Sequence, residues 1–335
     1  MGKNIVVCID GTGNEYGEND TNVERMYELV VRDKDQIAFY DPGVGTFSVF
    51  GRTLGKEIGI ILGKAFGVGL TENIEDAYSY LMDRFEPEDT LYLFGFSRGA
   101  FAVRCLAGML HKVGLLQKGS SNLIPYASKI YNTRGNAAIA NGFKKTYCNE
   151  CKPHFIGVWD TVGSLGLFYG RQFFDDRLNE DVPNAYQAIA IDEKRKKFSV
   201  SIWDETAVTP HQNVQQVWFA GVHSDVGGWY QERDLSNITL IWMLENAEKH
   251  DLRLKAGWRD GITGKPLGKT HESRTGLWRI WPAVIREIPE GAKIYSGVLT
   301  RRAEPSANYK PQLPTKYTEW KLSMPIKENS ENTIL

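Results

Sequence analysis

A serine stands between two glycines at the end of an apolar run, in the sequence Gly95-Phe96-Ser97-Arg98-Gly99. The run before it predicts a buried strand, and the apolar residues after it recur at the spacing of one helical face. A G-x-S-x-G motif between a strand and a helix is typical of a nucleophile elbow, a sharp turn that exposes a serine hydroxyl above a sheet. Glycine suits both flanking positions because such a turn leaves no room for a Cβ. Ser97 is therefore the candidate nucleophile, and a structural turn without chemistry is the alternative.

A serine hydroxyl is a weak nucleophile and needs a base, usually a histidine held by a carboxylate. In open α/β sheets, chemistry gathers at the carboxyl ends of the strands. Asp160 follows the strand predicted at residues 154–159, and His223 follows the one predicted at 215–222. The order Ser97, Asp160, His223 is the order of α/β-hydrolases. We therefore predict a catalytic triad of these residues.

Other residues compete for two of these roles. Asp160 is not the only candidate for the carboxylate, since an Asp at a strand end can simply cap a turn. Asp225 is close to His223 in the chain and is the second candidate. His211 follows Pro210 in a predicted turn and is the rival base. Without catalysis, His223 would be a hydrogen-bonded loop histidine.

The first strand ends in the sequence Asp-Gly-Thr-Gly-Asn at residues 10–14. As part of an oxyanion site, the Gly11 and Thr12 amides would complement the amide of Arg98. The turn is also similar to the D-x-D-x-T motif of phosphatases, with Asp10 in the second acidic position. The nucleophilic position of that motif is Cys8, which argues against a phosphatase. A tight turn held by Asp10 is the interpretation without chemistry.

The Arg98 side chain next to the candidate nucleophile also has two interpretations. A guanidinium can bind a substrate phosphate with two hydrogen bonds, or it can pair with an internal carboxylate. Pairing is the commoner outcome, and the sequence does not decide between them.

Composition excludes several classes of protein. The chain has 335 residues and a net charge of −1, with 42% hydrophobic and 24% charged residues. No global positive charge draws it to nucleic acid, and no apolar run is long enough to span a bilayer. The N-terminus lacks the apolar region of a signal peptide. We expect a protein that is not transmembrane and is cytoplasmic or secreted without a signal peptide, with peripheral membrane contact left open.

We expect neither a metal nor an organic cofactor. Cys148 and Cys151 have the C-x-x-C spacing with His154 nearby, but these supply three ligands where a structural zinc site needs four. An acyl-enzyme mechanism requires no cofactor.

The pattern of elements predicts an α/β fold. Strands are predicted at residues 4–9, 36–40, 90–94, 154–159 and 215–222. Helices are predicted between these strands. One helix begins at a capping box formed by Thr21 and Glu24, and another covers residues 70–85. Such alternation indicates a mostly parallel sheet with helices on both faces. We expect one domain over residues 1–335, with a core at 3–250 and an irregular C-terminal layer at 251–335.

Residues 51–69 are rich in glycine and apolar side chains. Two stretches in this segment resemble phosphate loops but are one residue too short and lack the Ser or Thr that follows the lysine. A close-packed helical hairpin in the core or a flap beside the active site remain as interpretations.

Five motifs together resemble one family. They are CIDGTGN at residues 8–14, FYDPGVGT at 39–46, LFGFSRGAFAVR at 93–104, FIGVWDTVGSLG at 155–166 and VWFAGVHSDVGGWY at 217–230. The chain is similar to the uncharacterised α/β-hydrolase domain family that includes type VI secretion phospholipase effectors. The resemblance implies a serine esterase acting on phospholipid acyl esters, with Ser97, Asp160 and His223 at the matching positions. It also implies that the turn at residues 10–14 lies beside the active site.

One position departs from the family pattern. Tyr295 stands where family members often have a histidine. We predict a serine esterase or lipase that cleaves carboxylic esters, with (phospho)lipid acyl esters as expected substrates. The alternatives are a non-catalytic binding or toxin-associated module that retains the hydrolase fold, and a phosphatase that uses Asp10.

Overall fold

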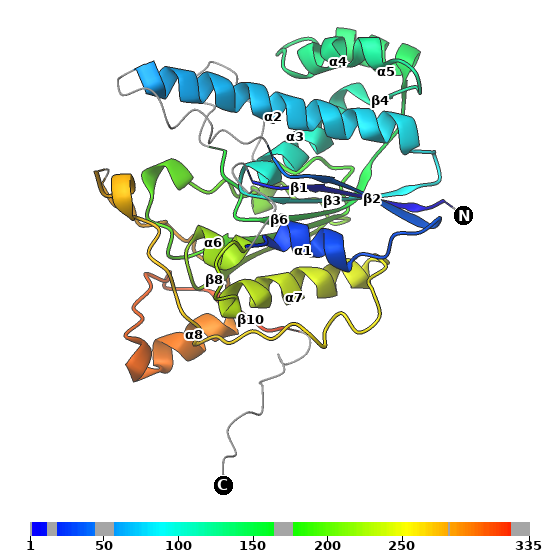
Figure 1. The fold of residues 1–335 in the computed structure, drawn as a ribbon. Coiled ribbons are helices and arrows are strands. Elements are labelled where there is room, and N and C mark those ends of the chain that lie inside the picture. The colour runs from blue at the N-terminus through cyan, green and yellow to red at the C-terminus, as the bar shows by residue number, and fades with distance from the viewer. Residues whose placement is uncertain (1, 12–18, 44–56, 164–176, 281, 323–335) are drawn as a thin grey trace.

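A parallel eight-stranded sheet forms the centre of the molecule (Figure 1). The computed structural model describes residues 2–11, 19–43, 57–163, 177–280 and 282–322. The strand order is β10-β9-β8-β7-β6-β3-β1-β2, and every neighbouring pair is parallel. The strands are β1 Asn4–Ile9, β2 Gln36–Asp41, β3 Thr90–Phe96, β6 Pro153–Trp159, β7 Asn184–Ala190, β8 Asn213–Phe219, β9 Lys293–Tyr295 and β10 Thr318–Trp320. A separate antiparallel pair joins β4, Leu115–Leu116, to β5, Cys148–Asn149.

Helices cover both faces of this sheet (Figure 1). The helices are α1 Asn22–Leu29, α2 Glu57–Arg84, α3 Arg98–Val113, α4 Ile124–Tyr131, α5 Ala137–Tyr147, α6 His223–Gly227, α7 Asp234–Lys249 and α8 Ser296–Ala303. Helices α2 and α3 lie on one face, and α1 and α7 on the other. Five 3₁₀ turns are described: η2 Ser121–Leu123, η3 Lys196–Phe198, η4 Glu205–Ala207, η5 Gly276–Ile280 and η6 Pro305–Ala307.

Strand β1 shows why the sheet is buried on both sides. Ile5, Val7 and Ile9 pack into the cluster with α2 and α3, while Val6 and Cys8 pack into the cluster with α1 and α7. Successive side chains of a strand point to opposite faces, so a strand covered on both sides must be apolar throughout. This pattern made the central strands recognisable, and the predicted α/β fold class is confirmed.

The five predicted strands are present, and the sheet contains three more. Strand β7 has the sequence NAYQAIA, in which Gln187 and Asn184 interrupt the apolar run, and its register places it between β6 and β8. Strands β9 and β10 have three residues each and extend the sheet beyond β8. The part of the chain expected to form an irregular layer, residues 251–335, thus contains two short strands of the central sheet, because β9 pairs with β8 and β10 pairs with β9.

The capping residue predicted for the first helix is confirmed. Helix α1 begins directly after Thr21, whose side chain accepts a hydrogen bond of 3.1 Å from the amide of Glu24. This bond satisfies one of the helix amides that have no partner within the helix. The helix ends at Leu29.

The glycine-rich segment falls partly outside the described residues, which resume at Glu57. From there its backbone forms the first part of α2, a continuous helix of 28 residues. A helical hairpin within residues 57–69 is therefore wrong. The flap predicted for residues 51–69 stays a prediction, and residues 51–56 lie outside the described residues.

Across the part of the chain that the structure describes, no helix combines the length and apolar character needed to cross a membrane.

Candidate active site

Ser97 occupies a sharp turn between β3 and α3. Its backbone has φ 57° and ψ −116°, and α3 begins at the next residue, Arg98. A positive φ is uncommon for a residue with a Cβ and indicates local strain. The turn is held by two backbone bonds to the end of β6, from the Ser97 amide to Trp159 O at 3.0 Å and from the Val162 amide to Ser97 O at 3.2 Å. This is the conformation that the motif predicted.

The glycines on either side of Ser97 are required by space. A Cβ on Gly95 would lie 2.5 Å from the carbonyl oxygen of Gly99, and a Cβ on Gly99 would lie 2.0 Å from the carbonyl oxygen of Ile9. Both contacts are with backbone atoms, which cannot move aside as a flexible side chain could. The elbow therefore packs directly against β1, and the predicted strand–turn–helix context is confirmed.

The structure brings Asp160 and His223 together from the ends of β6 and β8. Nδ1 of His223 lies 2.5 Å from Oδ2 of Asp160, although the residues are 63 positions apart in sequence. Asp160 is fully buried, and it also accepts a hydrogen bond of 2.9 Å from the amide of Ala190. A carboxylate bound to Nδ1 leaves Nε2 of the ring available to accept a proton.

Arg286 holds the same carboxylate from the other side. Its Nη1 donates to Oδ1 of Asp160 at 2.6 Å and its Nη2 to Oδ2 at 3.0 Å. The same two nitrogens donate to the carbonyl oxygens of Ala190 and Phe198, each at 2.7 Å. Burial opposes ionisation of Asp160, but the charges and hydrogen bonds of Arg286 and His223 outweigh it and hold its pKa well below the usual range. Asp160 is therefore a stable carboxylate.

Sequence reasoning missed Arg286 altogether. It lies in an irregular segment before β9, and a single arginine there has no periodicity or motif that would mark it. Only the folded chain brings it to Asp160, 126 positions away.

His223 is enclosed by aromatic rings. Its ring centroid lies 4.5 Å from that of Phe96, the residue before Ser97, and 5.0 Å from that of Phe198. Burial lowers the pKa of His223, and this effect exceeds the opposing effect of Asp160. The imidazole is therefore neutral at neutral pH. Among the hydrogen bonds of the described residues, none joins the Ser97 hydroxyl to His223. The distance between a nucleophile and its base is often too long for a hydrogen bond when an enzyme holds no substrate.

Glu193 supports this arrangement through the backbone of His223. Its carboxylate accepts hydrogen bonds from the His223 amide at 3.3 Å, from the Ser273 hydroxyl at 2.8 Å and from Nε and Nη2 of Arg195 at 2.9 Å each. Burial raises the pKa of Glu193, but the hydrogen bonds and charge of Arg195 outweigh this and lower it. The Arg195 guanidinium in turn lies 3.5 Å from the ring centroid of Phe198. Glu193 was not among the residues predicted from sequence.

The three candidate oxyanion donors, the amides of Arg98, Gly11 and Thr12, differ in what the structure shows for them. Arg98 is the first residue of α3, where backbone amides have no partner within the helix and the helix dipole is positive. Burial lowers the pKa of the Arg98 side chain to about 9. The Gly11 amide already donates to Oδ1 of Asp10 at 2.6 Å, so it could serve an oxyanion only by exchanging that bond. Thr12 lies outside the described residues.

Asp10 is a fully buried anchor of the turn after β1. Besides the Gly11 amide, it accepts hydrogen bonds from the Tyr40 hydroxyl at 3.0 Å and from the Thr21 hydroxyl. These donors occupy its oxygens and join the turn to β2 and to the start of α1. The arrangement favours the structural interpretation of Asp10 over a role in phosphatase chemistry.

The structure does not bring the secondary candidates into the Asp160–His223 pair. Asp225 instead accepts hydrogen bonds from His271, from its Nδ1 at 2.6 Å and its amide at 3.1 Å. His211 is exposed in the turn before β8, at the amino end of a strand whose carboxyl end leads to His223. Tyr295 ends β9 with its ring 5.2 Å from that of Phe219, in the hydrophobic core, and burial raises its pKa to about 12.

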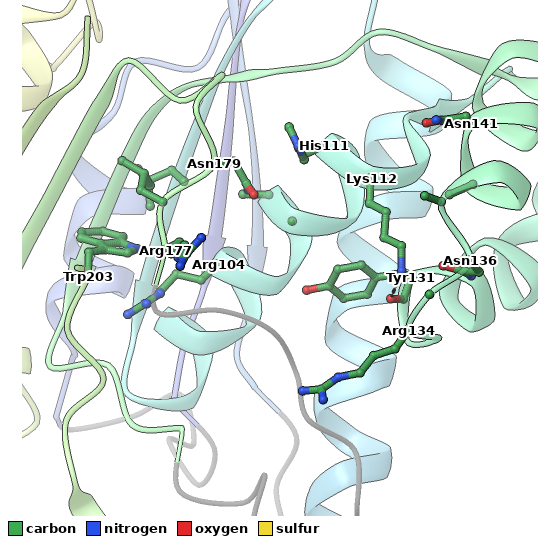
Figure 2. A pocket seen from close by; sticks show the side chains of 17 residues that line it. Arg104, His111, Lys112, Tyr131, Arg134, Asn136, Asn141, Arg177, Asn179 and Trp203 are labelled. Atoms are coloured by element: carbon green, nitrogen blue, oxygen red, sulfur yellow. Dashed lines mark hydrogen bonds between the residues drawn. The ribbon is translucent and has the colours of Figure 1, made fainter. Parts of the chain in front are cut away.

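A cavity of about 460 Å³ lies elsewhere, between α3, α4 and α5 (Figure 2). Its described lining includes none of Ser97, Asp160 and His223. Lys112, which Figure 2 shows beside Tyr131, donates to the carbonyl oxygens of Ile130, Tyr131 and Thr133 and so secures the end of α4. This lysine has a structural role, and the cavity is distinct from the candidate active site.

Comparison with known proteins identifies a family. The family model described as "T6SS, Phospholipase effector Tle1-like, catalytic domain" matches residues 3–246. The chain belongs to this family. The Tle1-like region contains Ser97, Asp160 and His223, and the resemblance seen in the sequence motifs is confirmed. Arg286 lies beyond the matched Tle1-like residues.

Two individual proteins are similar to this Tle1-like chain. An uncharacterized protein of Saccharomyces cerevisiae is 36% identical over an alignment that covers 59% of this chain and 32% of the yeast protein. A crystal structure of an uncharacterized protein from Pseudomonas aeruginosa matches with a TM-score of 0.46 and 17% identity, over 77% of this chain and 47% of that chain. The Tle1-like chain therefore spans less than half the length of either protein.

Proposed function

We propose that this chain is a serine hydrolase that cleaves carboxylic esters of lipids, with phospholipid acyl esters as its substrates. The observation that carries the proposal is the buried hydrogen bond between His223 and Asp160, built next to an elbow serine. Membership of a family of phospholipase effector catalytic domains supports the substrate class.

In the proposed reaction, the Ser97 hydroxyl attacks the carbonyl carbon of the ester. Nε2 of His223 accepts the hydroxyl proton, and Asp160 stabilises the imidazolium through Nδ1. The Arg98 amide and the positive end of the α3 dipole stabilise the negative charge that develops on the carbonyl oxygen. The imidazolium then gives its proton to the departing alcohol, a lysophospholipid for a phospholipid substrate. Water hydrolyses the acyl-enzyme by the same steps and releases a fatty acid.

Arg286 acts in this scheme as a positioning residue. It fixes both oxygens of Asp160 and thereby the direction of the bond to His223. It also keeps Asp160 ionised in a fully buried site, where an unpaired carboxylate would tend to take up a proton.

Covalent labelling tests the proposal directly. A fluorophosphonate reacts only with an activated serine, so intact-mass spectrometry of the wild type should show one stoichiometric adduct. Ser97→Ala should show none, and His223→Ala should label at least roughly a hundredfold more slowly, because general-base catalysis supplies rate factors of this size. Both variants should keep the circular dichroism spectrum of the wild type.

Hydrolysis should follow the same pattern. The wild type should release fatty acid from a phospholipid, and Ser97→Ala should not. A well-folded wild type that forms no adduct would overturn the proposal and favour the non-catalytic binding module. Phosphate-monoester hydrolysis that survives Ser97→Ala would favour the phosphatase.

A further inference from the structure

Three large aliphatic side chains are exposed in a short segment next to the candidate active site. The exposed fraction is 73% for Ile280, 42% for Val284 and 54% for Ile285. Single exposed apolar residues are normal on a protein surface, but several close together mark sites of interaction. The segment includes the end of η5, the golden turn at the left of Figure 1, at the same end of the molecule as α6.

A run of cationic residues lies against this segment. The amide of Val284 donates to the carbonyl oxygen of Lys194 at 2.9 Å, and Ala283 pairs with Arg195 in an antiparallel bridge. Residues 194–197 read Lys-Arg-Lys-Lys, and the three lysines are exposed. Two of the described carboxylates pair with this run: Glu193, which is buried against Arg195, and Glu272, which lies 4.0 Å from Lys194. Exposed apolar and cationic side chains thus occur together.

The same two segments build the candidate active site. Arg286 follows Ile285 directly and holds Asp160. Phe198, directly after the cationic run, contacts the ring of His223, and the Arg195 guanidinium lies 3.5 Å from the centroid of the Phe198 ring. A ligand seated on the exposed side chains would therefore lie beside the residues that handle the proton.

We propose that Ile280, Val284, Ile285, Lys194 and Lys196 form a docking surface for a phospholipid bilayer that contains anionic lipids. Protruding aliphatic side chains enter the boundary between headgroups and acyl chains, and lysines beside them are attracted to anionic headgroups. The attraction is local, since the whole chain has a net charge of −1. The inference rests on the proposed function, because a lipid hydrolase has to reach acyl esters held in a membrane.

Vesicle flotation tests the docking surface without requiring turnover. Ser97→Ala protein is mixed with vesicles of phosphatidylcholine, or of phosphatidylcholine with phosphatidylglycerol. Binding should favour the anionic vesicles and fall as salt is added, because salt screens exposed charges. Two double variants should each bind the anionic vesicles at least tenfold more weakly. One combines Ile280→Ser and Val284→Ser, and the other combines Lys194→Gln and Lys196→Gln. Ile285 is kept because it adjoins Arg286.

Matched controls lie on α5, away from this surface. Ile139 is 57% exposed and Lys145 is exposed, so Ile139→Ser and Lys145→Gln remove similar groups elsewhere and should leave vesicle binding unchanged. Failure of the Ser97→Ala protein to float with anionic vesicles would overturn the inference. Equal binding by the surface variants and the controls would also overturn it.

A second measurement separates this inference from the proposed function. The double variant Ile280→Ser and Val284→Ser is made in protein that keeps Ser97. It should hydrolyse a soluble short-chain ester at the wild-type rate. It should hydrolyse phospholipid in vesicles at least tenfold more slowly than the wild type. Equal loss on both substrates would overturn the docking surface. Absence of a fluorophosphonate adduct would refute the proposed function and leave the flotation result to decide docking alone.

Discussion

Arg286 and Asp160 form a buried pair in which two guanidinium nitrogens reach the two oxygens of one carboxylate, at 2.6 and 3.0 Å. His223 bonds to that carboxylate at the same time. The orientation of the candidate base therefore depends on a residue from the C-terminal part of the chain.

Loss of Arg286 should damage both stability and activity. Arg286→Met leaves Asp160 buried without its guanidinium, and removing one partner of a buried ion pair costs about 3–5 kcal/mol. The depressed pKa of Asp160 means that the pair stabilises the fold above the ordinary carboxyl pKa and that this stabilisation is lost in acid. Urea unfolding at neutral pH measures the loss.

The pH profile distinguishes a positioning role from a purely structural one. In Arg286→Met the acid limb of fluorophosphonate labelling should move to higher pH, because Asp160 would take up a proton more readily. Arg302→Met, on the exposed side of α8, is the control and should change neither measurement. A stable Arg286→Met protein with a wild-type profile would contradict the prediction.

Asp160→Asn should keep the shape of the site and remove its charge. The amide cannot stabilise an imidazolium, and the labelling rate should fall by roughly 10³–10⁴, as in other serine hydrolases with this arrangement. Arg286 would lose its charged partner, so the free energy of unfolding should also fall. Labelling within a factor of ten of the wild type would show that Asp160 does not orient the base.

Activity should decline in acid through protonation of His223. Burial lowers the pKa of this imidazole, so the acid limb should lie below the ordinary histidine pKa of about 6.5. Because folded His223 binds its proton less tightly than unfolded His223, its contribution makes the fold less stable as the pH falls below this value. Labelling rates measured across pH provide the check, and an acid limb above 6.5 would contradict the lowered pKa.

The elbow should not tolerate a methyl group at Gly99. Gly99→Ala places a Cβ 2.0 Å from the carbonyl oxygen of Ile9 and should destabilise the fold by at least about 1–3 kcal/mol, the usual range for overpacking. Gly142, in α5, has no atom within 4 Å of an added Cβ. Gly142→Ala should therefore stabilise the fold by about 0.5–1 kcal/mol through helix propensity. Thermal unfolding of the pair tests this contrast, and equal shifts would contradict it.

Local sequence patterns were sufficient to predict several parts of the site. The elbow at Ser97 was recognisable because the pattern of neighbouring residues predicts a buried strand, a turn with two glycines and an amphipathic helix in direct succession. Asp160 and His223 were recognisable because parallel strands bring their carboxyl ends to one edge of the sheet. Each of these predictions starts from a pattern in adjacent residues, and such a pattern also located the cap at Thr21.

Contacts between distant residues that no motif or strand end marks became evident only in the folded protein. Asp225 was a rival of Asp160 for the carboxylate, yet it bonds to His271, 46 positions away. Strand β7 was hidden because polar residues interrupt its apolar run, and its neighbours in the sheet supply the hydrogen bonds that define it. Arg286 is brought to Asp160 from 126 positions away by the packing of an irregular segment, for which no periodic signal exists. Contacts of this kind arise from burial and charge pairing in the completed fold, and adjacent residues do not encode them.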